Sequence, residues 1–295
     1  MMAICPAIRP ISLAPPARLA IYRARDAHPL VDTIWTCAIR MRFKYADLEQ
    51  DVARKVVITG AGEGLGRALA RRFSQGGDVV ILIGRTLAKV EAVAAELGGE
   101  AMAVQCDVGD PASVRAAFAT IAQTHPAIDM LINNAAIYQP FLVRDATDAQ
   151  VMEPLLTNFA GPIFCCRSAI PMMARGGHII NISSESVRMP FPMFAMYQSS
   201  KAGMERFTEA LHAELEPDGI RVTLVRAGQM FEEGKTWDVD PQVGMRFSQA
   251  CAKAGIDLRA RPISHFKSVA EMFHMLAGLP ADLQTPQVVL EARHP

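Results

Sequence analysis

The stretch KVVITGAGEGLG, residues 55–66, decides the fold, because a short apolar run passes directly into four glycines at alternate positions. The RALARRF that follows has apolar residues at helical spacing, so the segment predicts a strand, a glycine loop and a helix. Glycines let the backbone approach a ligand closely, and a helix N-terminus offers free N–H groups and a partial positive charge. We therefore expect a loop that binds the pyrophosphate of a dinucleotide, with contacts from Gly60, Gly62, Glu63, Gly64, Leu65 and Gly66.

Six further short runs rich in Val and Ile occur downstream, separated by segments of helix length. They cover residues 79–83, 101–105, 129–132, 178–183, 220–225 and 287–290. Continuous hydrophobicity along a run indicates that both faces of its strand are covered, as in a parallel sheet between helices. The pattern predicts a three-layer α/β fold of the Rossmann type, with a seven-stranded parallel sheet and helices on both faces. Residues 55–295 show no internal break in composition, so we expect a single domain.

Residues 1–54 are interrupted throughout by proline and arginine and show no sustained periodicity. We expect them to be a poorly ordered N-terminal extension. One alternative is that Met41 is the true start, and another is that the arginine-rich stretch before Asp26 is an organellar transit peptide. The apolar runs are too short for a secretory signal or a membrane span.

Charge and cysteine usage exclude several classes of function. Lys and Arg total 30, Asp and Glu total 30, and the formal net charge is zero. This balance disfavours nucleic acid and anionic membranes as partners, since both select a basic excess. The six cysteines show no CxxC spacing, and no HExxH pair occurs, so we expect a reducing, cytoplasmic location and no metal site.

The end of the second predicted strand bears on the choice of cofactor. A dinucleotide-binding fold has an acidic residue there when it binds the 2′-hydroxyl of NAD, and an arginine when it accommodates the 2′-phosphate of NADP. Gly84 and Arg85 stand at this point, which favours NADP(H) over NAD(H). Glu63 in the glycine loop would oppose this choice if it pointed towards the phosphate.

Tyr197 and Lys201 form a candidate catalytic pair at the start of a predicted helix. Residues four apart share a helix face, so the phenol and the ammonium can act on one reacting centre. A tyrosine with its ordinary pKa near 10 is a slow acid or base at pH 7, and a neighbouring cation lowers that pKa. We therefore expect Lys201 to lower the pKa of Tyr197.

Several motifs occur in one order along the chain. They are the glycine loop Thr59–Gly66, the NNAA segment Asn133–Ala136, Asn158, Ser184 and the Tyr197/Lys201 pair. Together they resemble the short-chain dehydrogenase/reductase family, in its single-domain group with TGxxxGxG and YxxxK motifs. The likeness runs from Lys55 to the C-terminus, with Ala136 and Ala227 at positions where the family usually has Gly and Pro.

The resemblance implies a role for each matching residue. Ser184 polarises the substrate carbonyl, Tyr197 is the acid/base, and Lys201 binds the nicotinamide ribose. Asn158 holds a water that relays protons to Lys201, and Asn133 stabilises the central sheet. The remaining cofactor contacts that it implies are Asp107, Val108, Asn134, Ala135, Ala136, Ala227 and Gly228. Family members also commonly assemble as homodimers or homotetramers through helices equivalent to 148–175 and 195–216.

Segments 185–196 and 229–262 are expected to line the substrate pocket. They contain Met189, Phe191, Phe194, Met196, Met230, Phe231, Met245 and Phe247. Such side chains suit a bulky apolar ketone or alcohol, but they could equally pack a lid helix against the sheet. Glu185, Glu232 and Glu233 disfavour an anionic substrate.

The sequence thus predicts an oxidoreductase that transfers a hydride between NADP(H) and a carbonyl or secondary alcohol of a bulky apolar small molecule. An alternative is an NADPH-binding regulatory or scaffold protein without turnover, although such a protein has no use for an intact acid/base pair. An epimerase or dehydratase of the related nucleotide-sugar fold is a third reading. It would need a longer C-terminal substrate region than the roughly 70 residues after the sixth predicted strand.

Overall fold

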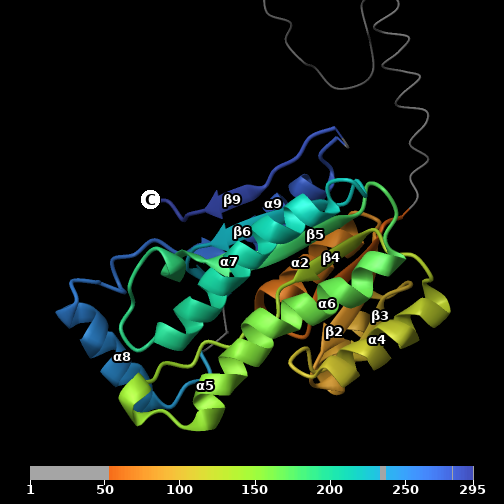
Figure 1. Cartoon of the computed structure of the whole chain (residues 1–295). Coiled ribbons are helices and arrows are strands. Elements are labelled where there is room, and N and C mark those ends of the chain that lie inside the picture. Colours follow the sequence, from red (N-terminus) through yellow and green to blue (C-terminus); the bar gives the residue numbers. More distant parts are fainter. Residues whose placement is uncertain (1–52, 233–236, 281, 295) are drawn as a thin grey trace, which may run out of the picture. The chain divides into compact units, whose positions relative to one another are not determined.

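A parallel sheet forms the centre of the molecule (Figure 1). The computed structural model describes residues 53–232, 237–280 and 282–294. Seven strands of this part make up the sheet, and all their pairings are parallel. They are β1 (Lys55–Thr59), β2 (Val79–Gly84), β3 (Met102–Gln105), β4 (Met130–Asn133), β5 (His178–Ser184), β6 (Arg221–Ala227) and β9 (Gln287–Leu290). The predicted fold class is confirmed, and each predicted run overlaps one strand of the sheet.

The spatial order of the strands is β3-β2-β1-β4-β5-β6-β9, so the chain begins near the middle and winds outward in both directions. The order reverses between β1 and β4, because β2 and β3 lie on one side of β1 and the later strands on the other. In open sheets of this kind, ligands bind at the carboxyl ends of the strands near such a reversal. The topology therefore fixes where a site is expected.

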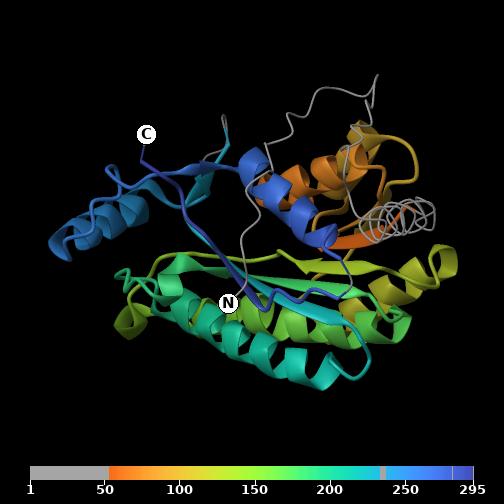
Figure 2. The same ribbon diagram turned by 90° about the horizontal axis from the view of Figure 1, so that it is seen from above.

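Helices cover both faces of the sheet, which gives the predicted three layers (Figure 2). One face packs against α2 (Gly64–Gln75), α3 (Leu87–Leu97) and α9 (Phe266–Ala277). The other face packs against α4 (Pro111–Thr124), α6 (Gly161–Ala169) and α7 (Ala195–Leu215). Alternation along β1 shows how one strand serves both cores, since Val56 and Ile58 belong to the first cluster and Val57 to the second.

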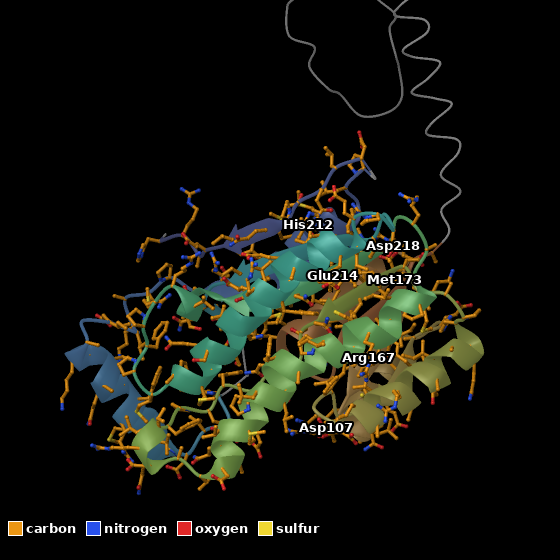
Figure 3. All side chains as sticks on the ribbon, viewed as in Figure 1. Asp107, Arg167, Met173, His212, Glu214 and Asp218 are labelled. Carbon is orange, nitrogen blue, oxygen red and sulfur yellow. The ribbon has the colours of Figure 1, made fainter. Side chains whose placement is uncertain are left out.

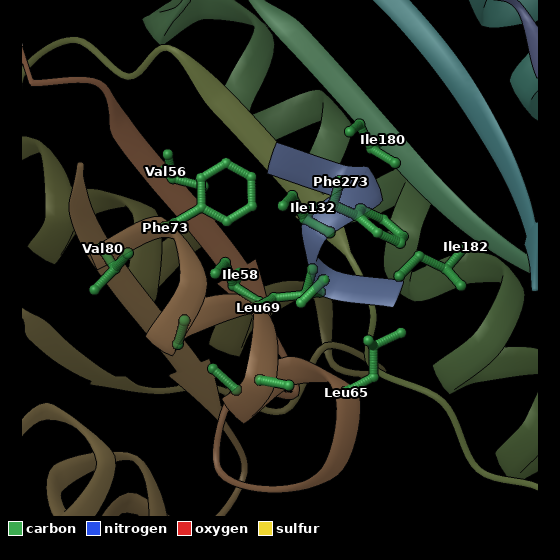
Figure 4. Close-up of a cluster of buried hydrophobic side chains, with 14 of the residues drawn as sticks. Val56, Ile58, Leu65, Leu69, Phe73, Val80, Ile132, Ile180, Ile182 and Phe273 are labelled. Atoms are coloured by element: carbon green, nitrogen blue, oxygen red, sulfur yellow. The ribbon is translucent and has the colours of Figure 1, made fainter. Parts of the chain in front are cut away.

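The first cluster fixes the glycine loop to the sheet (Figure 4). Leu65 and Leu69 lie in the first turns of α2 and pack beside Ile58 of β1. Phe73 of the same helix and Phe273 of α9 are both fully buried in this cluster. The start of α2 is thus held by its own apolar side chains, which leaves the loop before it a defined position.

The helix expected over residues 148–175 differs from the prediction. The structure has α5 (Asp148–Pro154), a π-helical turn (Leu155–Ala160), α6 and a 3₁₀ turn (Ile170–Met172). Pro154 and Pro162 flank the π turn, and neither has an N–H for the helical ladder. The N–H of Gly161 instead bonds to the carbonyl of Leu156, five residues back. The prediction of one regular helix was therefore wrong in this detail.

Additional elements lie beyond the carboxyl ends of the strands. Helix α8 (Pro241–Lys253) packs in a separate small cluster with Phe191 and Met193. Strands β7 (Met230–Phe231) and β8 (Ser264–His265) form a two-stranded parallel sheet, which the sequence pattern did not predict. Two-residue strands are too short to show a hydrophobic period, so this omission has a simple cause.

The predictions made for the N-terminal extension lie, except for Ala53 and Arg54, outside the described residues. Among the residues that are described, no helix is both long and apolar enough to cross a membrane. The same residues contain no group of three or more His, Cys, Asp or Glu side chains arranged to hold a metal ion.

Candidate active site

One cavity of about 760 Å³ opens at the carboxyl ends of the strands. Its walls include residues that follow β1, β2, β3, β4, β5 and β6, so the site lies where the strand order predicts it. All the cofactor residues expected from the sequence line this cavity except Gly66. Of the expected catalytic residues, Ser184, Tyr197 and Lys201 line it and Asn158 does not.

The glycine loop is packed tightly against the segment that follows β4. Gly60 has a φ of +65°, a conformation that L side chains rarely adopt, and a Cβ there would lie 2.9 Å from the Cα of Ala135. A Cβ on Gly66 would overlap the carbonyl oxygen of Gly60. Gly66 does not line the cavity, but the lack of a side chain there allows the loop to pack closely on itself.

Hydrogen bonds join the end of β1 to the NNAA segment. The Oγ1 of Thr59 accepts the N–H groups of Asn134 and Ala135, each at 3.0 Å. The Nδ2 of Asn134 donates to the carbonyl of Thr59 at 2.9 Å. Nearby, Asn133 donates to Oδ1 of Asn181 at 2.8 Å and so links β4 to β5, as the resemblance implied. Hydrogen bonds thus hold together two loops that are distant in sequence.

The far end of the cavity carries both charges that bear on cofactor choice. Arg85 is exposed at the cavity wall directly after β2. Glu63 pairs with Lys89 of α3, with 2.9 Å between Oε2 and Nζ, which offsets the repulsion expected from Glu63. The sequence analysis missed Lys89, although its place one helical turn after Arg85 could have suggested it.

Asp107 and Val108 follow β3 and line the same end of the cavity. The carboxylate of Asp107 accepts the N–H of Gly109 at 2.9 Å, which stabilises the turn. In Figure 3, Asp107 lies towards the lower end of the molecule, whereas Asp218, which follows α7, lies towards the upper end. The expected adenine contacts, Asp107 and Val108, therefore lie after the carboxyl end of β3, where the cavity opens.

Lys201 and Tyr197 lie in the first turns of α7, and Ser184 ends β5. The ammonium of Lys201 donates to the carbonyl of Ile182 at 2.7 Å, and burial lowers the pKa of this lysine to about 8. Burial raises the pKa of Tyr197 to about 12, although a hydrogen bond with Ser184 lowers it. The pKa of Tyr197 therefore lies above its ordinary value and not below it as expected, because desolvation of the phenol is the largest effect.

Asn158 lies buried in the π turn, and its carboxamide is occupied by other protein groups. Its Oδ1 accepts the N–H of Ile137 at 2.8 Å, and its Nδ2 donates to the carbonyl of Ile137 at 2.8 Å and to Oγ of Ser200 at 3.1 Å. Both amide protons are thus used. The water relay implied by the resemblance would have to use the backbone of Asn158, and it stays a prediction.

A buried ion pair supports the catalytic residues from behind. Arg226 of β6 binds Glu205 of α7 through two hydrogen bonds of 2.8 and 2.6 Å, and Ser183 donates to the same carboxylate at 2.7 Å. Burial raises the pKa of Glu205, but the bonds from Arg226 and Ser183 outweigh it and leave the pKa below its usual value. The pair fixes α7 against the strands that carry Ser184, and the sequence analysis missed it because its members are 21 residues apart.

The opposite end of the cavity is lined by aromatic side chains. Phe191, Phe194, Met230, Phe231 and Phe247 line it as expected, whereas Met189, Met196 and Met245 do not. Tyr138 and Trp237 also line it, and the sequence analysis did not single them out.

Two of the three glutamates expected to disfavour an anion have cationic partners. Glu185 pairs with Arg261 at 2.5 Å and Glu232 with Arg71 at 3.5 Å, so the charge of each carboxylate is partly compensated. Glu233 lies outside the described residues.

Comparison with known proteins agrees with this geometry. The family model for short chain dehydrogenases matches residues 54–234. The mouse dehydrogenase/reductase SDR family member 7B is 35% identical over 185 residues. That match covers 59% of this chain and 56% of the mouse protein, so the chain spans little more than half the length of this relative.

Two solved structures extend the match to the fold. The 3-ketoacyl-(acyl-carrier-protein) reductase from Brucella melitensis, complexed with NADH, has a TM-score of 0.67 at 26% identity. A metagenomic short-chain oxidoreductase in complex with NADP has a TM-score of 0.66 at 25% identity. The matches cover 80% and 82% of this chain, and 96% and 98% of the solved chains. With the glycine loop, the seven-stranded sheet and the Ser184, Tyr197 and Lys201 cluster, these matches show that the chain belongs to the short-chain dehydrogenase/reductase family.

Proposed function

We propose that the chain is an oxidoreductase that interconverts a carbonyl and a secondary alcohol with NADP(H), acting on a bulky apolar small molecule. The observation that carries this proposal is the position of Ser184, Tyr197 and Lys201 on the wall of the same cavity as the glycine loop. This arrangement supports a reaction in which Ser184 donates a hydrogen bond to the substrate oxygen, Tyr197 supplies a proton and Lys201 provides a buried cation beside them.

The glycine loop fits a dinucleotide on steric grounds. Three glycines of the loop, Gly60, Gly62 and Gly64, line the cavity. A Cβ on Gly60 would lie 2.9 Å from the Cα of Ala135, and a Cβ on Gly62 would lie 2.9 Å from the Cβ of Lys89, so the loop has no room for larger residues there. The helix α2 begins at Gly64, so its first N–H groups face the same region. The residues at the cavity that would hold the cofactor are Gly60, Gly62, Glu63, Gly64, Leu65, Arg85, Asp107, Val108, Asn134, Ala135, Ala136, Tyr197, Lys201, Ala227 and Gly228.

The preference for NADP(H) rests on positive charge at the far end of the cavity. Arg85 and Lys89 both line this end, and the residues next to Arg85 at the end of β2 include no acid. A guanidinium suits a phosphate because it donates several hydrogen bonds in a fixed plane. Known relatives bind either cofactor, since one solved neighbour holds NADH and another NADP.

Removing Arg85 tests this preference directly. Arg85→Ala should raise the Kd for NADPH by about tenfold or more and leave the Kd for NADH nearly unchanged, because one charge-assisted hydrogen bond is lost. Fluorescence titration of both cofactors measures it. Arg144→Ala is the matched control, since Arg144 is 80% exposed and does not line the cavity. Equal loss of affinity for the two cofactors would show that Arg85 does not contact a 2′-phosphate.

The side chains support general acid catalysis in the direction of reduction. A bound nicotinamide cofactor supplies the hydride. With its pKa near 12, Tyr197 is protonated at neutral pH and can donate a proton to the carbonyl oxygen. Ser184 can donate a hydrogen bond to the same oxygen, and this bond strengthens as negative charge develops there. The charge of Lys201, whose pKa is about 8, favours the phenolate that remains.

Tyr197→Phe tests the reaction class. The variant should lower kcat for ketone reduction by at least about a hundredfold, because general acid catalysis contributes roughly 10² to 10⁴ in rate. Binding of NADPH should change little, and titration of the same sample checks this. Turnover like that of the wild type would end the assignment. A wild-type protein that binds NADPH but reduces none of a broad panel of apolar ketones would instead favour a regulatory or scaffold role.

A homodimer or homotetramer and a cytoplasmic location are part of the proposal. Met152 on α5 is 48% exposed, and Leu156 on the π turn is 40% exposed. Apolar side chains exposed on adjacent turns suit contact with a second copy. Sedimentation as a strict monomer at micromolar concentration would refute the oligomer.

A further inference from the structure

Two aromatic side chains, Tyr138 and Phe194, contact the ring of Tyr197 in the cavity, and a third, Trp237, contacts both of them. Tyr138 follows β4, Phe194 precedes α7, and Trp237 precedes α8, so each comes from a different segment. We call these three residues the aromatic box. All of them line the cavity together with Tyr197. The chain has only 6% aromatic residues, so their convergence beside one phenol calls for an explanation.

The rings of the box are in mutual contact. Tyr138 and Trp237 stack, with centroids 5.9 Å apart and planes 16° apart. Phe194 meets Trp237 edge-on at 6.1 Å and Tyr197 at 5.5 Å, and Tyr138 lies 6.2 Å from Tyr197. These distances lie in the range in which aromatic rings attract one another. A ligand ring that joined the box would lie only a short link from an oxygen bound to Tyr197.

The rings of the box are packed against a residue behind them. Phe247 of α8 packs against Phe194 at 4.6 Å and against Trp237 at 5.6 Å, and Phe247 itself is buried. The walls therefore cannot move inward without breaking the small cluster under α8. Tyr138 is 41% exposed, so a bound ring could still cover apolar surface there.

The charges at this end do not favour a charged ligand. Arg261 pairs with Glu185, the residue after Ser184, and its guanidinium also lies 5.1 Å from the ring centre of Phe191. The carboxylate of Glu185 is therefore already paired with Arg261 and does not select a cationic group on a substrate. A neutral group with polarisable faces fits this wall best.

We propose that the substrate carries a neutral flat ring one short link away from its carbonyl or alcohol carbon, and that Tyr138, Phe194 and Trp237 select for that ring. This inference rests on the proposed function, and it adds to it a substrate class and three specificity-determining residues. Flat rings gain edge-to-face and offset contacts that a saturated ring of similar size cannot make. The expected preference is about 3- to 10-fold.

The test compares phenylacetone with cyclohexylacetone, whose rings are of similar size and are insulated from the carbonyl by a methylene group. Phenylacetone should be reduced with a kcat/KM about 3- to 10-fold higher. The ratio should fall to near one in Trp237→Leu and in Tyr138→Leu. Met245→Ala is the matched control, because Met245 lies on α8, is 63% exposed and does not line the cavity. Tyr138→Leu keeps the test valid if Trp237→Leu fails to fold.

A binding measurement tests the preference for a flat ring independently of the reaction. The chain has two tryptophans, so Trp35→Phe leaves Trp237 as its one tryptophan reporter. In the presence of NADP⁺, which cannot reduce a ketone, phenylacetone should change the Trp237 fluorescence with a Kd about 3- to 10-fold lower than that of cyclohexylacetone.

The outcomes distinguish the two proposals. Preferential binding of phenylacetone without reduction by NADPH would support the aromatic box and overturn the proposed reaction. Reduction of both ketones with equal kcat/KM would overturn the aromatic box and leave the reaction standing. Absence of both binding and reduction would overturn both. A preference that persists in Trp237→Leu and in Tyr138→Leu would show that these residues do not make the selection.

Discussion

At the glycine-loop end of the cavity the walls are mainly backbone, whereas at the Tyr197 end they are mainly side chains. Gly60, Gly62 and Gly64 line the cavity from one loop, and the close packing of Gly60 on Ala135 and of Gly62 on Lys89 depends on the lack of a Cβ. Around Tyr197, by contrast, the wall comes from Tyr138, Phe194, Trp237 and Phe247, spread over more than a hundred residues. A backbone wall tolerates almost no added atoms, while a side-chain wall can be rebuilt by substitution.

Lys201 lies where the two ends meet, and its effect on stability is the largest we expect. Its pKa is about 8 in the folded protein and near 10.5 when exposed, so the unfolded chain binds more protons between these values. The free energy of unfolding should therefore rise from pH 7 to pH 10, by up to about 3 kcal/mol relative to Lys201→Met. Urea denaturation of both proteins at each pH measures the difference. Parallel curves would show that the ammonium is solvated in the folded state.

Gly66→Ala breaks the backbone wall. The new methyl group would overlap the carbonyl of Gly60 and the side chain of Asn134, so the loop or the NNAA segment must shift. Overpacking of this kind costs about 1 to 3 kcal/mol, which corresponds to a fall of roughly 2 to 12 °C in Tm for a domain of this size. Calorimetry measures the change, and titration should show weaker NADPH binding. An unchanged Tm would contradict the tight packing described for this loop.

Gly244→Ala is the corresponding change in the side-chain wall, and we expect it to be the smallest. Gly244 lies within α8, and a Cβ there would make an ordinary contact of 3.4 Å with Val239. Alanine favours a helix over glycine by up to about 1 kcal/mol, so the variant should be slightly more stable. The same calorimetry compares it with Gly66→Ala. A loss of stability as large as that of Gly66→Ala would remove the distinction between the two ends.

This contrast explains which features the sequence could predict. The strands, the glycine loop and the Tyr197/Lys201 pair are local patterns, since each is complete within a short stretch of chain. The aromatic box, the Glu185–Arg261 pair and the Glu205–Arg226 pair join residues that are far apart in sequence. Their partners become visible only after the chain has folded. The pKa of Tyr197 was misjudged for the same reason, because burial depends on the surrounding fold.

The π turn at Leu155–Ala160 has a consequence for the insertion and deletion of residues. Each residue turns a helix by about 100°, and a π turn holds one residue more than the regular spacing requires. Deleting Thr157 would remove that extra residue and turn the backbone around its neighbour Asn158 into regular helix. Asn158 would then lose Ile137 and Ser200 together. A one-residue deletion here should therefore do more harm than several substitutions on the exposed side of α5.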